Sequence, residues 1–237
     1  MIQAARRASR GFTLIELLIA ITILAMLSML IYGAFSGMRN TKMGLERIGD
    51  RYREGRLAMA RIARDLQGAY ISAHLPIDAS RTVVKTAFIG KSGGTADRLD
   101  FNSFSNVRRD QNSHVSDQAE ISYFASQNPD ENGVTDLARR ISEYPDLEPT
   151  KGGRVEVLCT DIELFELEYL DPQSGSWTES WDTTQAAGQP NRLPLQVRVN
   201  LVLKGGKRPK DSYERDVLRF HTQIPIQMLN PLNFATL

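Results

Sequence analysis

The hydrophobic pattern of the chain begins with one long apolar run near the N-terminus. From Leu17 to Phe35 there are 19 residues with no charge and no proline. A helix of this length rises about 28 Å at ~1.5 Å per residue, close to the ~30 Å hydrocarbon core of a bilayer. The run therefore predicts a membrane-spanning helix.

A second pattern starts at Arg39, where apolar residues recur at helical spacing among charged ones. No proline occurs before Pro76, so nothing forces the helix to stop at the membrane surface. The sequence predicts one helix from about Thr13 to about Tyr70, whose second half packs on a globular head. The expected apolar stripe, in which Gly55 fills one step, comprises Leu45, Ile48, Tyr52, Met59, Ile62, Leu66 and Ala69.

After Pro76 the period becomes two, which is typical of half-buried antiparallel strands with one solvated face. Clusters of Gly, Asn, Asp and Pro separate the alternating runs and predict turns. Six to eight strands laid on the striped helix give an α+β fold. The clearest alternation covers residues 121–125, 165–169, 195–203 and 218–226.

The N-terminus is open to three interpretations. A basic leader with Arg6, Arg7 and Arg10 precedes the apolar run and keeps this end in the cytoplasm. An ordinary signal peptide, cut near Ala34, has an apolar core of only about 7–15 residues and seldom carries a carboxylate at its head. A plain membrane anchor would make Glu16 incidental. The third interpretation takes the residues from Arg10 to Glu16 as one motif.

The string Arg10-Gly11-Phe12-Thr13-Leu14-Ile15-Glu16 resembles the prepilin peptidase motif of type IV pilins and pseudopilins. The resemblance implies cleavage between Gly11 and Phe12, followed by N-methylation of the new Phe12 amine. An unpaired intramembrane carboxylate costs several kcal/mol. In a bundle of such helices, the Phe12 amine of a neighbouring subunit would pair with Glu16, which gives Glu16 a role in assembly. The alternative is a Glu16 that snorkels to the membrane surface or is protonated, with no partner.

A series of features lies on the late helix and in the head. The features are, in order, Ala63-Arg64-Asp65-Leu66, Leu137-Ala138-Arg139-Arg140, the strand around Phe165, Trp177, Trp181 and Leu193-Pro194. Their order resembles that of minor pseudopilin J of type II secretion systems. This implies a pilin-like fold and a structural role near the tip of a short periplasmic filament, beside minor pseudopilins I and K, in support of protein export across the outer membrane. The alternative is a minor pilin of a type IV pilus, with a priming or adhesion role.

The resemblance and the pattern together divide the chain into four parts. Residues 1–11 are the cleaved leader, and residues 12–38 are the transmembrane half of the long helix. Residues 39–75 are its periplasmic half, and residues 76–237 form an antiparallel, β-rich globular head. The expected location is the bacterial inner membrane, crossed once, with the N-terminus in the cytoplasm and the head in the periplasm. Prepilin peptidase and membrane lipid are then further partners.

Composition and charge argue against nucleic-acid binding and against an intrachain disulfide. The net charge of the whole chain is +1, and removal of the leader leaves 26 basic and 28 acidic residues, so there is no electrostatic reason to bind nucleic acid. The single cysteine, Cys159, cannot form an intrachain disulfide and is expected to be buried.

No candidate chemistry stands out, and the sequence predicts neither an enzyme nor a cofactor. His74, His114 and His221 are scattered, without the spacing of metal ligands. Glu166 and Glu168 lie on the expected solvated face of a strand. The acidic turn Asp130-Glu131-Asn132 is a weak calcium candidate, and Trp177 and Trp181 are expected to fold back onto the head or to meet a partner.

Overall fold

The computed structural model describes residues 11–73, 84–107, 116–205 and 217–233. A single helix, α1 (Leu14–Gln67), is 54 residues long. The chain divides into two compact units, residues 1–48 and residues 49–237, and α1 contributes to both. Each unit is described separately.

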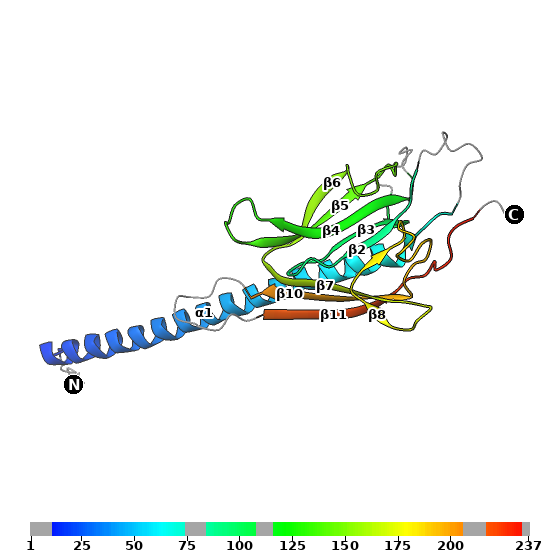
Figure 1. Cartoon of the computed structure of the whole chain (residues 1–237). Coiled ribbons are helices and arrows are strands. Elements are labelled where there is room, and N and C mark those ends of the chain that lie inside the picture. The colour runs from blue at the N-terminus through cyan, green and yellow to red at the C-terminus, as the bar shows by residue number, and fades with distance from the viewer. Residues whose placement is uncertain (1–10, 74–83, 108–115, 206–216, 234–237) are drawn as a thin grey trace, which may run out of the picture. The chain divides into compact units, whose positions relative to one another are not determined.

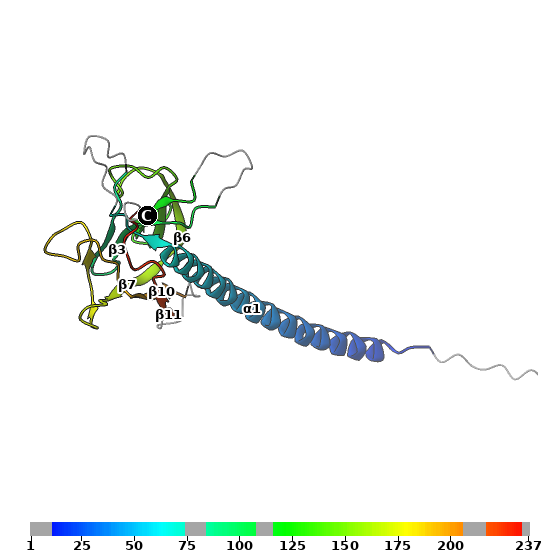
Figure 2. The same cartoon turned by 90° about the vertical axis from the view of Figure 1, so that its right-hand side faces the viewer.

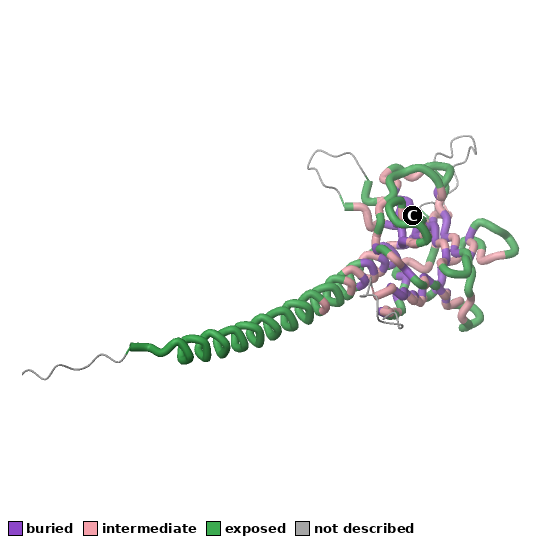
Figure 3. The backbone as a smooth tube through the Cα atoms, turned by 90° about the vertical axis from the view of Figure 1, so that its left-hand side faces the viewer, coloured by how far each residue is buried: buried purple, intermediate pink, exposed green. Residues whose placement is uncertain are grey.

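The first unit is the N-terminal part of α1, and its large apolar side chains are exposed from Phe12 to Met38 (Figure 3). An exposed apolar surface of this extent is unusual for a protein in water. By length and composition, α1 is able to cross a membrane near the N-terminus of the chain. The prediction of one long N-terminal apolar helix is confirmed.

The second unit, the head, holds two antiparallel sheets (Figure 1). The first has the strand order β6-β5-β4-β3-β2-β9, with β1 paired to β3, and the second has the order β11-β10-β7-β8. The strands of the first sheet are β1 (Ala69–Tyr70), β2 (Phe88–Lys91), β3 (Arg98–Ser103), β4 (Ala119–Gln127), β5 (Thr135–Ser142), β6 (Arg154–Cys159) and β9 (Trp181–Asp182). Those of the second are β7 (Ile162–Leu170), β8 (Trp177–Thr178), β10 (Gln196–Lys204) and β11 (Val217–Pro225).

The strands confirm the predicted α+β fold and most of its detail. The four alternating runs of the sequence fall on β4, β7, β10 and β11. The described residues contain eight strands of four or more residues, the upper end of the predicted range, and three strands of two residues. Two-residue strands carry no period, so a pattern search does not find them.

The core of the head forms where the last part of α1 lies between the two sheets (Figures 1 and 2). The buried helical residues are Gly55, Ala58, Ile62, Asp65 and Leu66. Gly55 lets α1 approach β11 closely, because a Cβ atom there would lie 2.3 Å from the Phe220 ring on β11. A glycine at this step of the helix therefore sets the spacing between α1 and the second sheet.

The predicted stripe is only partly buried, which corrects the expected extent of packing. Ile62 and Leu66 are fully buried, whereas Leu45, Ile48 and Tyr52 remain exposed. Tyr52 makes an edge contact with the Phe220 ring, with centroids 6.0 Å apart. Helical spacing defines a face of α1, but it does not say how far along that face the strands of the head reach.

The helix ends at Gln67, three residues before the predicted end. The Ser103 hydroxyl donates to the Asp65 carbonyl at 2.6 Å, and the Phe104 amide donates to the Gly68 carbonyl at 2.9 Å. These donors satisfy carbonyls that a longer helix would have used itself. Ala69 and Tyr70 then pair with β3 as the short strand β1.

Candidate functional site

The residues of the predicted processing motif lie at the start of α1. Gly11 precedes the helix, and no atom lies within 4 Å of the position that a Cβ would occupy there. Phe12 is exposed. An exposed backbone outside any helix or strand, as at Gly11 and Phe12, is accessible to a protease. The assignment of these two residues to processing stays a prediction.

Glu16 and Thr13 form a reciprocal cap at the first turn of α1. The Thr13 amide and hydroxyl each donate to Glu16 Oε2 at 3.0 Å, and the Glu16 amide donates to Thr13 Oγ1 at 3.3 Å. This is a capping box, in which two backbone donors at a helix start are satisfied by side chains three residues apart. The Thr-x-x-Glu spacing is the sequence signal for it, and the interpretation of Glu16 as an assembly residue overlooked that signal.

The cap gives Glu16 a partner within its own subunit. Pairing with the Phe12 amine of a neighbouring subunit would use the same carboxylate, and that pairing stays a prediction. Oε2 of this carboxylate already accepts two hydrogen bonds from Thr13, whereas no described residue donates to Oε1.

Two helical side chains, Arg51 and Glu54, attach α1 to the turn between β6 and β7. The Arg51 guanidinium donates to the carbonyls of Thr160 and Lys204 at 3.0 and 2.9 Å. Glu54 Oε1 accepts from the Thr160 amide at 2.7 Å, and Glu54 Oε2 binds Arg51 at 2.6 Å. One ion pair therefore connects α1 with the turn after β6 and with the end of β10.

A second polar attachment joins α1 to strands β4 and β5 of the first sheet and is fully buried. Asp65 Oδ2 accepts from the Tyr123 hydroxyl at 2.7 Å and from Arg139 Nε at 2.6 Å, and both side chains of the ion pair are 0% exposed. Arg139 also binds Glu156 at 2.9 Å. Burial raises the pKa of Tyr123 well above its ordinary value, and the Asp65 carboxylate raises it further, so the hydroxyl remains a donor. A buried ion pair is weak evidence for stability, but removal of one partner would leave an uncompensated buried charge, so helix and strands are held in the arrangement that pairs them.

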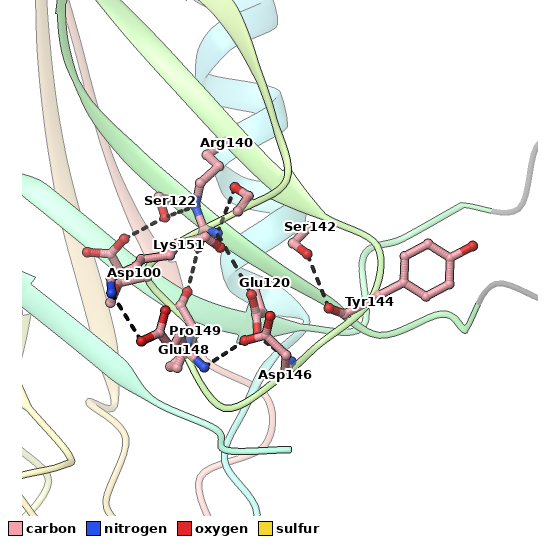
Figure 4. Close-up of polar contacts among 12 residues, drawn as sticks. Asp100, Glu120, Ser122, Arg140, Ser142, Tyr144, Asp146, Glu148, Pro149 and Lys151 are labelled. Carbon is pink, nitrogen blue, oxygen red and sulfur yellow. Dashed lines mark hydrogen bonds and ion pairs between the residues drawn. The ribbon is translucent and has the colours of Figure 1, made fainter. Parts of the chain in front are cut away.

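A third group of buried charges lies around Arg140 and orders the segment between β5 and β6 (Figure 4). We call residues 143–153 the β5–β6 loop. The Arg140 guanidinium donates to the carbonyls of Pro149, Lys151 and Gly152 in this loop. Its Nε donates to the Ser122 hydroxyl at 2.8 Å.

Glu120, on β4, holds the other arm of the same loop. Its Oε1 accepts from the Asp146 amide at 2.8 Å, while Oε2 lies 3.8 Å from Arg140 without a hydrogen bond. Burial raises the pKa of Glu120 above its ordinary value of 4.5, and burial lowers the pKa of Arg140. Neither Glu120 nor Arg140 was singled out as buried by the sequence, because charged residues of strands are usually solvated.

The other candidate residues of the sequence are dispersed over the head. Cys159 is buried as predicted, and burial raises its pKa to about 12. Trp181 is buried, with its indole N–H donating to the Arg192 carbonyl at 2.8 Å. Trp177 is half-buried, and the Arg198 guanidinium lies 3.9 Å from its ring centroid. Both tryptophans therefore fold back onto the head.

The acidic candidates do not form a catalytic or metal site in the described structure. Glu166 binds Asn200 at 3.1 Å, and Glu168 binds Arg198 at 2.7 Å, as side chains of the solvated face of the second sheet. Within the described ranges, no three His, Cys, Asp or Glu side chains come together in a way that could hold a metal ion. His74 and His114 lie outside the described residues, and His221 is exposed.

The chain was compared with known families and structures. Residues 33–213 match the family described as type II secretion system (T2SS), protein J, and residues 6–32 match the prokaryotic N-terminal methylation motif. A comparison with curated proteins gave no match.

Two solved structures are similar in fold. One is a chain of the GspK-GspI-GspJ complex of the type II secretion system of enterotoxigenic Escherichia coli, with TM-score 0.46 and 14% identity, over 77% of this chain and 99% of that one. The other is a type IV-like pilin from Thermus thermophilus, with TM-score 0.44 and 12% identity, over 74% and 96%. Since both TM-scores are below 0.5, any assignment of the family rests on the sequence match.

Proposed function

We propose that this chain, which belongs to the family of type II secretion system protein J, is a minor pseudopilin. In this role it is a structural subunit of the pseudopilus, the short periplasmic filament that supports protein export across the outer membrane. The observation that carries the proposal is the family match over residues 33–213, preceded directly by the N-terminal methylation motif.

The architecture supports a filament subunit. The first unit is a helix with an exposed apolar surface, which either lipid or the helices of other subunits would cover. The second unit is a head with its own core and two sheets. A subunit of this kind moves from the membrane into a filament by exchanging lipid contacts for helix contacts.

The processing steps follow from the motif. Prepilin peptidase cuts between Gly11 and Phe12, on the cytoplasmic side of the inner membrane, and the Phe12 amine is then methylated. The leader of residues 1–11 is removed, and the anchor of residues 12–38 stays attached to the periplasmic half of the helix, residues 39–75, and to the β-rich part of the head, residues 76–237. The head lies in the periplasm.

The proposed partners are the other minor pseudopilins, of the I and K types, near the tip of the filament. The chain itself is not an enzyme in this proposal. Its polar clusters support this view, since Asp65, Arg139 and Arg140 hold structural elements together. Glu166 and Glu168 pair across a solvated sheet face.

Deletion and complementation in the native host test the function. Loss of the gene should stop export of the substrates of the type II system, so that they accumulate in the periplasm, and the wild-type gene should restore export. Mass spectrometry of the membrane-extracted protein should show an N-terminus at methylated Phe12. A mature protein that begins at Met1 or beyond Ala34 would contradict the processing scheme.

The same deletion separates the alternative, a minor pilin of a type IV pilus. The N-terminal methylation motif is compatible with both assignments. A loss of surface pili with normal export of type II substrates would favour the pilus. Unchanged pili with blocked export would support the pseudopilin.

A further inference from the structure

We propose that the β5–β6 loop is a preorganised docking surface, whose Tyr144 and Leu147 enter an apolar pocket with a basic rim on a neighbouring pseudopilin. The inference rests on the proposed function, because it assumes that other pseudopilin heads lie beside this one.

The tip of the loop presents large apolar groups to solvent. Tyr144 is 70% exposed and Leu147 is 54% exposed. Figure 4 shows the Tyr144 ring pointing away from the polar contacts that surround Arg140. Tyrosine supplies a large, rigid and amphipathic contact at a low cost in conformational entropy, and it is enriched at interfaces.

Buried charged groups hold both arms of the loop, although the loop itself is at the surface. Three of its carbonyls accept from the Arg140 guanidinium, and its Asp146 amide donates to Glu120. The Ser122 hydroxyl, which accepts from Arg140, donates to Asp100 Oδ1 at 2.5 Å. Arg98 then binds the Asp100 carboxylate through two bonds of 2.7 and 2.8 Å.

The loop is also bound at its tip and at its exit. The Ser142 hydroxyl donates to the Tyr144 carbonyl at 3.2 Å, and the Lys85 amide donates to the Asp146 carbonyl at 2.8 Å. At the exit, Gly153 has a φ of 74°, and a Cβ there would lie 2.4 Å from the Ile141 carbonyl oxygen. Only glycine fits this turn without strain.

Stability alone does not account for this arrangement. Apolar residues of similar volume commonly stabilise a fold as well as a buried ion pair does, or better. What Arg140 and Glu120 supply is one fixed geometry for a segment that carries two exposed apolar side chains. A loop that is ordered before binding loses less entropy when it binds.

The charges of the loop indicate the chemistry of its partner. Asp146 and Glu148 are exposed beside the apolar tip, and the single lysine of the loop, Lys151, is paired with Glu148 at 3.0 Å. Glu143 adds a third carboxylate, so the loop is net negative. Complementarity then requires Lys or Arg on the rim of the partner. An anionic membrane surface would repel the loop, so the expected partner is a protein.

Site-specific photo-crosslinking in the native host identifies the occupant. Full-length protein with benzoylphenylalanine in place of Tyr144 should crosslink to another pseudopilin. Protein with the same group in place of the exposed Arg219, on β11, should not give that product. A product with lipid alone, or no product from protein that has entered the pseudopilus, overturns the inference. Protein that never enters the pseudopilus contradicts the proposed function instead.

Matched substitutions test the contact itself, with detergent-solubilised full chains and the pseudopilin that crosslinks. Tyr144→Ser combined with Leu147→Ser should weaken binding about tenfold or more, since this is the usual effect of losing a hot-spot contact. Val107→Ser, at an apolar side chain that is 65% exposed outside the loop, should leave binding unchanged. Equal binding by the two variants would refute the docking surface.

A substitution behind the loop tests preorganisation separately, by affinity and amide hydrogen exchange. Asp100→Asn weakens the support of the loop through Ser122 and leaves Tyr144 and Leu147 in place. It should reduce affinity and increase amide hydrogen exchange of residues 143–153. Wild-type affinity together with faster exchange would refute preorganisation. Binding of the wild-type chain should also weaken as salt is raised, and binding that is independent of salt would refute the basic rim.

Discussion

Glu16 is the residue with two competing interpretations. Its carboxylate caps the start of α1 within the subunit, and it is also predicted to pair with a neighbouring subunit in the filament. Within the subunit it closes a capping box with Thr13. In a filament it would meet the Phe12 amine of a neighbour. Variants of the two capping residues separate these roles, because only the second role needs a negative charge.

Glu16→Gln should impair incorporation into the filament, and Thr13→Val should not. Glutamine keeps the capping box but has no charge, whereas valine removes the cap at a cost of about 0.5–2 kcal/mol and leaves the carboxylate. The measurement is the fraction of mature protein found in isolated filaments. Cleavage at Gly11 and methylation of Phe12 are checked in parallel by mass spectrometry. Wild-type incorporation of Glu16→Gln would show that the charge has no assembly role.

Glu120→Gln should stabilise the head near neutral pH. Burial raises the pKa of Glu120, so the folded state binds its proton more tightly than the unfolded state does. The contribution of this group to stability is thus fully present below pH 4.5 and is lost as the pH rises through the raised pKa. Glutamine keeps an acceptor for the Asp146 amide without the buried charge.

Thermal melts between pH 4.5 and 8 measure this effect. Each kcal/mol gained raises the Tm of a domain of this size by about 2–4 °C. The advantage of Glu120→Gln should be largest at pH 8 and should shrink toward pH 4.5. Glu148→Gln, at an exposed carboxylate, serves as the control and should change Tm little. A lower Tm for Glu120→Gln at pH 8 would mean that Arg140 needs the charge of Glu120 as its counter-ion.

At the scale of elements, the contact between α1 and β11 depends on one missing side chain. Gly55→Ala places a Cβ 2.3 Å from the Phe220 ring. Overpacking of this kind costs about 1–3 kcal/mol, partly offset by the ~1 kcal/mol gain in helix propensity. Gly49→Ala, where nothing lies within 4 Å, receives only the gain and should be neutral or stabilising.

The partner of this contact offers a rescue. Phe220→Leu, combined with Gly55→Ala, should recover part of the lost stability in a denaturant melt, because the smaller side chain makes room for the methyl group. Equal stability of Gly55→Ala and Gly49→Ala would mean that Phe220 moves aside without cost.

The elements also show what a sequence pattern can and cannot predict. The long helix was predicted from its apolar run and helical spacing, and the strands β4, β7, β10 and β11 from a period of two, although the start of β4 is buried on both faces. The buried charges Asp65, Arg139, Arg140 and Glu120 were not predicted, since the buried ion pairs Asp65–Arg139 and Glu120–Arg140 each join two different elements. The helix end was placed too late because Ser103, far along the chain, supplies a donor there.

The proposed functional residues divide in the same way. Gly11, Phe12 and Glu16 lie close together in the sequence, so a local motif suffices to propose them. The order of the β5–β6 loop depends on Arg140, Ser122 and Asp100, which come from three different strands. Contacts among residues from three strands have no short-range sequence signature, so they could not be predicted from the sequence.

At the scale of the whole molecule, the compact unit of residues 49–237 predicts that the head is independent of the anchor. A fragment of residues 39–237 should be soluble and should unfold in one cooperative transition. An insoluble fragment, or one without a cooperative melt even beside a partner pseudopilin, would contradict this.

Cys159 reports on the same transition. Its thiol is buried and its pKa is raised to about 12, so in the folded fragment it should resist alkylation at pH 8. Labelling should appear together with the loss of structure in denaturant. Rapid labelling of the native fragment would indicate that the head opens near β6 before it unfolds.

The cap at the start of α1 has a consequence for how subunits remain in the membrane and then assemble into a filament. In a subunit inserted in the membrane, Thr13 would already occupy Oε2 of Glu16, so the carboxylate would be partly satisfied before another monomer meets it. If a neighbour's amine binds at Oε2, joining would be an exchange of partners in which a methylated amine replaces the Thr13 donors. A swap of similar bonds releases little free energy by itself. The direction of growth would therefore come from the machinery that lifts subunits out of the membrane, and idle subunits would not polymerise on their own.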